Sequence, residues 1–452
     1  MKMNSRNLAL FGIIAFLFVL EGIWKLNIGP AGGQQFTIFA GSWNSSLVIM
    51  NLCLISAIMA LGVNMQWGYA GLFNTGIVGF VALGGLAPVL ISSPVVPEVW
   101  VGSGVYRLIA GFIMGAAVIA AAVALYGRTT GRTRLLSMAA LLIGGFFVYR
   151  AIVDPAITFI ESNNPAAYGN IGGLSLPALI SWPVGGLFAA GAAWVIGKIA
   201  LGLRSDYLAI ATLGIGEIIV AILKNEDWLD RGVKNVINIP RPWPVPDEVD
   251  LQASPRFHDW VTGMGWDPVT ASTIMVKLLY GALFLTVLLL LLWACELALK
   301  SPWGRMMRAI RDNETAARAM GKNVTGRHLQ IFILGSAVCG MAGAMLVTLD
   351  GQLTPGSYTP LRFTFTIWLM VIVGGSGNNW GAILGAFLIW FLWIKVEPWG
   401  NALMWSVTQG MDDASTLKHY LIDSAAQMRT ITMGVILLLV LRYSPRGLIP
   451  ER

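Results

Sequence analysis

One carboxylate, Glu217, stands near the middle of a long apolar run, 206–224. An ionised side chain at membrane depth costs about 3 kcal/mol or more, so an acid there should face protein or a water-filled route. Two interpretations stay open. Glu217 either lines or gates a transport pathway, or it is a structural acid that caps backbone broken near Gly214 and Gly216 or pairs with a partner subunit.

A second set of polar groups opens the glycine-rich run 72–92. Asn74 and Thr75 are placed there to hydrogen-bond a passing substrate, or equally to cap the helix that follows. Further along, Gly374-Gly-Ser-Gly377 allows a tight break in the backbone. That break is either a re-entrant turn beside a route or an ordinary loop.

Residues for catalysis, for a metal or for ATP binding show no working pattern. The three histidines are far apart, and the three cysteines lie in apolar runs without a CxxC spacing. The string from Gly191 to Lys198 has the wrong spacing for a Walker A loop. We therefore predict no catalytic residue, no metal site and no cofactor bound by this chain, so the protein is not an enzyme.

The elements that must position these groups are membrane-spanning helices. Of 452 residues, 56% are hydrophobic and 12% charged, against about 25% charged in soluble domains. Apolar runs are long enough to cross a bilayer as helices, and the short alternating segments of a β-barrel are missing. The predicted fold is an all-α polytopic bundle of about 10–12 spans in one permease domain, 1–452. The candidate spans are 7–26, 45–64, 72–92, 105–126, 135–152, 178–200, 206–224, 271–297, 328–349, 362–375, 381–397 and 429–442. Of these, 72–92 and 362–375 are short or glycine-rich, so each either spans fully or is re-entrant.

Charge in the loops predicts the orientation. Loop 127–134 and segment 300–327 are basic, whereas loop 225–270 is rich in acids, so the first two should be cytoplasmic and the third extracytoplasmic. An even number of spans then puts both termini in the cytoplasm, in agreement with basic residues at both ends: Lys2, Arg6, Arg442, Arg446 and Arg452. The net charge of +7 follows from this sidedness and does not indicate nucleic acid.

Segment 300–327 also predicts a short amphipathic helix, from about Arg305 to Met320, that Gly321 can end. Met306, Ala309, Ile310, Ala317 and Met320 would share its apolar face. The pattern alone leaves two interpretations: a helix at the lipid surface, or a docking element for a cytosolic partner.

The string Glu314-Thr-Ala-Ala-Arg-Ala-Met-Gly321 resembles the cytoplasmic loop of bacterial ABC importer permeases. In order and spacing, the chain resembles the branched-chain amino acid (LivM-like) permease family. The strings that carry the resemblance are Gly68–Gly76, Leu203–Glu217, Gly232–Pro242, the Glu314 string, Gly374–Gly381 and Ser444–Leu448. The family's early segment differs at 72–75, and 93–176 has no counterpart that we can place.

The resemblance implies a type II-like importer subunit in the bacterial inner membrane. Its partners would be a second, related permease, two cytosolic ATPases that use the ATP, and a periplasmic binding protein. It also implies a coupling segment, for which we select Arg308, Glu314, Ala317 and Gly321. The expected cargo is a branched-chain or other neutral amino acid. The alternatives are urea or a short amide, or an ion-coupled secondary transporter that uses Glu217.

Overall fold

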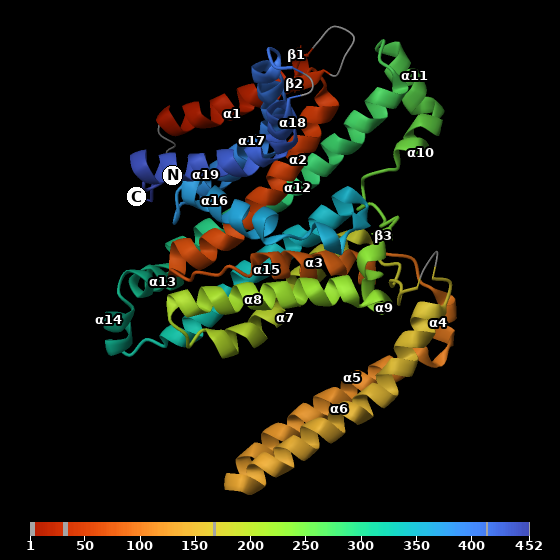
Figure 1. Cartoon of the computed structure of the whole chain (residues 1–452), viewed down its shortest axis with the longest axis vertical. Coiled ribbons are helices and arrows are strands. Elements are labelled where there is room, and N and C mark those ends of the chain that lie inside the picture. Colours follow the sequence, from red (N-terminus) through yellow and green to blue (C-terminus); the bar gives the residue numbers. More distant parts are fainter. Residues whose placement is uncertain (1–4, 30–34, 166–168, 413–414, 452) are drawn as a thin grey trace.

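The chain folds into a bundle of apolar helices (Figure 1). The computed structural model describes residues 5–29, 35–165, 169–412 and 415–451. In this part of the chain nine helices are long and apolar enough to cross a membrane. They are α2 (Trp43–Asn64) with the π-helical turn η1 (Met65–Tyr69), α5 (Ser103–Arg128), α6 (Gly131–Ser162), α7 (Ala178–Ala200), α8 (Ser205–Asn225), α12 (Pro268–Lys300), α15 (Val324–Asp350), α17 (Asn379–Thr408), and the run from α18 (Thr416–Asp423) through η5 (Ser424–Gln427) to α19 (Met428–Tyr443).

Three shorter apolar helices complete the set. They are α1 (Ser5–Ile23), α3 (Ile77–Ile91), and η4 (Leu361–Phe365) continued by α16 (Thr366–Gly374). Together these twelve segments match the twelve predicted spans one for one. At 1.5 Å per residue α3 is only about 22 Å long, less than a bilayer's hydrocarbon core of about 30 Å. The two spans that looked suspect in the sequence, 72–92 and 362–375, are thus both short helices.

Glycines let the central helices α3, α7 and α15 approach closely. A Cβ on Gly84 would collide with the carbonyl of Gly340, and one on Gly340 would lie 2.6 Å from the Gly185 carbonyl oxygen. Close backbone contact between small residues drives helix association in lipid, where a hydrophobic driving force is missing. This contact buries α3 and α15 at the centre of the bundle, beside α2.

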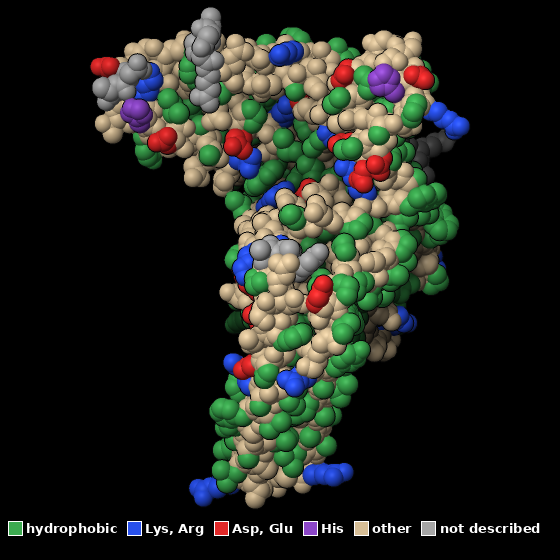
Figure 2. Space-filling view, turned by 90° about the vertical axis from the view of Figure 1, so that its right-hand side faces the viewer, with side chains coloured by type: hydrophobic (Ala, Val, Ile, Leu, Met, Phe, Trp, Pro, Cys, Tyr) green, Lys and Arg blue, Asp and Glu red, His purple; other side chains and the backbone are tan. Residues whose placement is uncertain are grey.

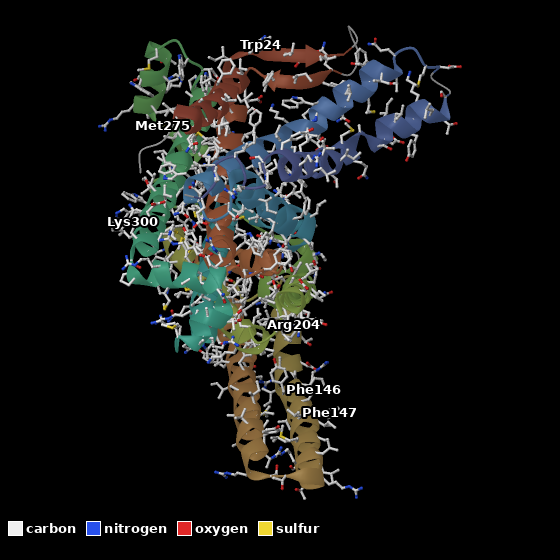
Figure 3. All side chains as sticks on the ribbon, turned by 90° about the vertical axis from the view of Figure 1, so that its left-hand side faces the viewer. Trp24, Phe146, Phe147, Arg204, Met275 and Lys300 are labelled. Carbon is white, nitrogen blue, oxygen red and sulfur yellow. The ribbon has the colours of Figure 1, made fainter. Side chains whose placement is uncertain are left out.

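Helices α5 and α6 form a hairpin that stands apart from the other spans (Figures 1 and 3). It joins the bundle at its base, where Val99, Leu108 and Val153 pack near Trp228. Further out, Phe146 and Phe147 on α6 are 55% and 65% exposed. The hairpin is thus apolar on its outer faces and requires lipid or another apolar surface around it. It accounts for most of the stretch 93–176 that has no counterpart in the resemblance.

The two ends of the bundle carry the extramembrane elements. One end holds α13 (Pro302–Asp312), α14 (Glu314–Ala319), the start of α1 and the chain's C-terminal residues (Figure 1). The other end holds the pieces of segment 225–270 and its neighbours. These are α4 (Pro97–Val101), α9 (Asp227–Asp230), η2 (Gly232–Lys234), α10 (Glu248–Ala253), α11 (Pro255–Gly263), η3 (Pro355–Ser357), and the antiparallel pair β3 (Val236–Ile237) and β4 (Gln352–Leu353).

Segments 300–327 and 225–270 thus lie at opposite ends, as their charges predict. Of the basic residues that predicted the sidedness of the termini, Lys2, the Arg6 side chain and Arg452 lie outside the described residues.

An overhang extends from the second end. It consists of the hairpin of β1 (Lys25–Ile28) and β2 (Phe36–Ala40) with α18 and the last turns of α17. Figure 2 faces this end and shows the surface hollowed beneath the overhang, with basic and acidic side chains beside the hollow.

The span predicted over 381–397 ends too early. It left Lys395 near its end, but α17 continues to Thr408, so Lys395 lies inside the helix. It pairs with Glu21 of α1 at 2.5 Å. Glu217 is therefore not alone among ionisable groups inside the spans.

Candidate translocation route and coupling segment

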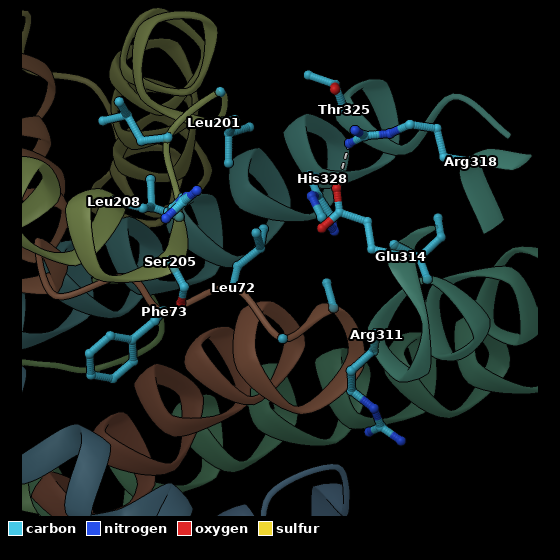
Figure 4. A pocket seen from close by; sticks show the side chains of 16 residues that line it. Leu72, Phe73, Leu201, Ser205, Leu208, Arg311, Glu314, Arg318, Thr325 and His328 are labelled. Carbon is cyan, nitrogen blue, oxygen red and sulfur yellow. Dashed lines mark hydrogen bonds and ion pairs between the residues drawn. The ribbon is translucent and has the colours of Figure 1, made fainter. Parts of the chain in front are cut away.

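Three cavities follow one another along one side of the bundle. The first, of about 570 Å³, lies at the α13–α14 end (Figure 4), and we call it the α14 cavity. It is lined by residues 70–73, 201–205, 208, 310, 311, 314, 318, 325 and 328. Glu314 and Arg318 form an ion pair of 2.5 Å at its wall, beside His328.

The second, the α8–α16 groove, has a volume of about 510 Å³ and an apolar wall. Its lining residues are Phe73, Thr75, Leu213, Pro360, Leu361, Thr364, Phe365, Trp368, Leu369, Ile372 and Leu437. The Phe73 ring packs edge-on against Trp368 with centroids 4.6 Å apart. Phe73 also lines the α14 cavity, so the two cavities meet at this side chain.

The third, the Trp390 cavity, has a volume of about 390 Å³ and lies toward the other end. It is lined by Leu52, Thr359, Leu361, Arg362, Trp390, Trp393, Ile394 and Arg429. Leu361 lines this cavity and the groove alike, so the three cavities form a series. Its charged groups are two arginines set against aromatic rings.

Both arginines of the Trp390 cavity lie over rings. The Arg362 guanidinium carbon is 4.9 Å from the Phe363 centroid and 5.7 Å from that of Trp390, and Arg429 lies 4.9 Å from the centroid of Trp393. In the sequence, both stand at the first residue of a predicted span, 362–375 and 429–442. The sequence held a signal that these arginines are unusual. Both begin predicted spans on the extracytoplasmic side, where basic residues are usually scarce.

The three pathway residues chosen from the sequence are not brought together. Asn74 is buried and its side chain is used inside the protein: it donates to Gln66 Oε1 at 2.9 Å and accepts from the Gly76 backbone N–H at 2.9 Å. Thr75 lines the groove, but its hydroxyl donates to the Ala209 carbonyl at 2.5 Å.

Glu217 lies on the outer face of α8, exposed and without a hydrogen bond or ion pair to any described residue. Leu213, one turn before it, lines the groove. The bundle core therefore does not contain this acid. The Glu217 side chain faces outward, on the same face of α8 as Leu213.

The coupling segment differs from the single helix expected over 305–320. Two helices form, α13 and α14, and Asn313 separates them by accepting a hydrogen bond from the Ala316 N–H at 2.9 Å. Ala317 packs with Ile310, Val324 and Met306, but Met320 is 79% exposed and does not share that face.

The four coupling residues do not lie at one site. Glu314 faces the α14 cavity, and Gly321 ends α14 in the left-handed region at φ +74°. Arg308 instead lines a separate hollow of about 320 Å³ with Glu296 and Asn379. A residue that the sequence did not single out, Arg311, ties the segment to the bundle. Its guanidinium donates to the Gly68 carbonyl at the end of η1 and to Glu451 at 2.8 Å.

A bundle of apolar helices long enough to cross a bilayer, with short polar helices at one end, is the architecture of a multi-pass membrane protein. More particularly, the chain belongs to the family described as branched-chain amino acid transport system / permease component, whose model matches residues 136–441, more than half of the sequence. This family confirms the resemblance.

Two relatives carry related descriptions. The chain is 34% identical over 212 residues to the high-affinity branched-chain amino acid transport system permease protein LivM of Salmonella typhimurium. The matched residues make up 46% of this chain and 48% of that protein. It thus spans about half the length of this relative. The chain is also 24% identical over 400 residues to the probable branched-chain amino acid transport permease protein LivM of Methanocaldococcus jannaschii. This match covers 87% of the chain and 90% of that protein. No solved structure matches the chain.

Proposed function

We propose that this chain is one permease subunit of an ATP-driven importer for branched-chain or other neutral amino acids in the bacterial inner membrane. The observation that carries the proposal is the series of three cavities, each of which shares a lining side chain with the next. Both junctions are single side chains, Phe73 and Leu361. These are positions where small movements open or close a route.

The route is half built in this chain, and a second permease completes it. The groove is open on the outside of the bundle, and Glu217 stands exposed one turn from Leu213 on its rim. An acid that faces hydrocarbon would cost a few kcal/mol. A second subunit that covers this side removes the cost and encloses the groove.

The wall of the groove supports an amino acid with an aliphatic side chain as cargo. Leu213, Phe365 and Trp368 offer apolar contact midway along the series. A Leu-sized side chain gains about 1.5–3 kcal/mol when it leaves water for such a surface. Urea or a short amide would gain nothing from that wall, so the groove favours a branched side chain.

The energy comes from partners at the α13–α14 end, which we place in the cytoplasm with both termini. Two ATPases dock there, and Arg311 transmits their movement to η1 and hence to α2. A periplasmic binding protein delivers cargo at the opposite end, near β3 and β4. In this arrangement Glu314 and Arg318 lie where the coupling segment meets the route.

The test is uptake of leucine into liposomes. The chain is purified with its partner permease, its ATPases and its binding protein, and uptake is measured with ATP and with a non-hydrolysable analogue. Uptake should need hydrolysis. If this chain alone moves leucine without ATP, and Glu217→Gln abolishes that transport, then the ion-coupled transporter is correct and the importer proposal is wrong.

A further inference from the structure

We infer that the Trp390 cavity is a carboxylate-binding site, where the carboxylate of the amino acid cargo first meets the membrane part of the transporter. The inference rests on the proposed function, because it takes the cargo to be an amino acid. It adds a binding site, formed by Arg362, Arg429 and Trp390, in which the cargo has a defined orientation.

Three N–H donors around this cavity have no acceptor. They are Nε of Arg362, Nε of Arg429 and the indole Nε1 of Trp390, all buried and without a hydrogen bond to any residue that the structure describes. A buried donor left unpaired costs about 1–3 kcal/mol. Trp390 is only 4% exposed, so its N–H is sheltered from bulk water. All three donors belong to residues that line this cavity, and a bound oxyanion can supply the acceptors that they lack.

The charges around the cavity leave one arginine free. Arg429 donates to Glu397, which holds it in place and balances its charge. Arg362 makes no ion pair or side-chain hydrogen bond within the described ranges, and Asp350 acts on it only from beyond ion-pair distance. Arg362 is therefore the lining arginine that has no ion-pair partner among the described residues, and a single carboxylate can pair with it.

The aromatic rings fix where the arginines can reach. Phe363 and Trp390 lie against Arg362, and Trp393 lies against Arg429, so both planar groups are stacked and pre-organised for a planar carboxylate. Leu361 closes the cavity on the side of the groove. A cargo held by its carboxylate here can point its aliphatic side chain past Leu361 into the apolar groove.

A lipid phosphate could use the same donors, but the surroundings favour the cargo. The cavity shares Leu361 with the groove, which shares Phe73 with the α14 cavity, and a headgroup site does not need such a series. We therefore assign the site to the carboxylate of a free amino acid, and the experiment includes the lipid as a separate arm.

The experiment uses a single reactive cysteine in the assembled transporter. Thr359 is exposed and lines the cavity, whereas Cys53, Cys295 and Cys339 are buried, so Thr359→Cys gives a clean signal. Labelling rates with anionic (sulfonatoethyl) and cationic (trimethylammonioethyl) methanethiosulfonates are each divided by the reagent's rate with a free thiol. The anionic reagent should react about tenfold faster, because a positive cavity concentrates anions.

The controls assign this preference to the site. Adding Arg362→Gln should reduce the ratio to near one, and Trp390→Phe should reduce it partly. Arg107→Gln, at an exposed arginine of α5, should leave it unchanged. Leucine should slow labelling, whereas leucinamide, which lacks the carboxylate, should not. The result should be the same in liposomes with and without acidic phospholipid.

Three outcomes would overturn the inference. The first is no preference for the anionic reagent, and the second is a preference that survives Arg362→Gln. The third is labelling of Thr359→Cys that is slowed by acidic phospholipid and not by leucine. The last would make this a lipid headgroup site. Wild-type leucine uptake driven by ATP is measured in parallel, so a failure of the site leaves the proposed function standing, and absent uptake shows that the function itself is wrong.

Discussion

Glu21 of α1 and Lys395 of α17 form an ion pair with side chains 0% and 6% exposed, which joins the first span to the eleventh. Ser45 of α2 donates to the second carboxylate oxygen at 2.7 Å, so three helices meet at this acid. A buried charge is tolerated only when its partner and its hydrogen bonds are in place. The pair therefore fixes the position of α1 against the bundle.

Breaking this pair on one side should destabilise the protein strongly. Glu21→Met leaves Lys395 buried without a counter-charge, and we expect a loss of about 3–5 kcal/mol. Glu21→Met combined with Lys395→Met should recover most of it. Thermal unfolding in detergent is the measurement, with Asp154→Ala in the exposed pair of Arg150 and Asp154 as the control. Equal stability of the single and double variants would contradict the assignment.

The contact of α3 with α15 should tolerate no side chain at Gly84. Gly84→Ala places a methyl group against the Gly340 carbonyl, and overpacking of this kind costs about 1–3 kcal/mol. Gly191→Ala on α7 is the matched control, since nothing lies within 4 Å of its added carbon. Folded yield and melting temperature should fall for the first variant alone. A Gly84→Ala protein as stable as wild type would show that the helices pack less closely.

Acid should stabilise the segment around Asp230, which lies outside the spans. Burial raises the pKa of this carboxyl from 3.8 to about 7, and the charge of Asp227 adds to the rise, although the Gly232 N–H opposes it. The folded segment thus binds more protons than the unfolded one between about pH 4 and pH 7. Its stability is complete below that window and falls by a few kcal/mol as pH rises through it.

Hydrogen exchange of amides 226–235 measures this effect. After correction for intrinsic rates, protection should be greater at pH 5 than at pH 8. Asp230→Asn keeps an acceptor for the Gly232 N–H but cannot titrate, so its protection should not depend on pH. Wild-type protection that is equal at both values would refute the raised pKa.

Met320 should take part in docking the ATPase, although it does not share the apolar face that the sequence predicted for it. It is 79% exposed beside α14, and an exposed apolar side chain on a polar segment suits an interface. Met320→Asp should reduce the ATPase recovered with the permease about tenfold, a loss of roughly 1.4 kcal/mol. Arg132→Asp, at the tip of the α5–α6 hairpin, should not. Equal recovery from both variants would move the docking site elsewhere.

Periodicity and length predicted much of the fold. Twelve apolar runs became twelve helices, because each run must satisfy its own backbone hydrogen bonds in lipid. Helix ends were harder to predict. Lys395 looked like the end of a span because nothing local shows that Glu21, far away in the chain, neutralises it.

The site was predicted less well, for two physical reasons. Asn74 has the right chemistry for a route, but its amide bonds with Gln66, and that pairing depends on the tertiary fold. Arg362 and Arg429 start different spans, and only the packing of α17 between them makes a single cavity. The break at Asn313 had a local signal, since asparagine favours helix starts, but the alanine-rich sequence around it concealed that signal.

The most direct test of the route is access to its two ends during the ATP cycle. Thr359→Cys reports on the Trp390 cavity and Ser205→Cys on the α14 cavity, and both residues are exposed. Each is labelled with an impermeant reagent from its own side, in the ATP-free transporter and in one trapped with a non-hydrolysable analogue. We expect the two rates to change in opposite directions, by about fivefold or more, because one conformation opens each end. Rates that both stay constant, or that rise and fall together, would contradict a route along this side of the bundle.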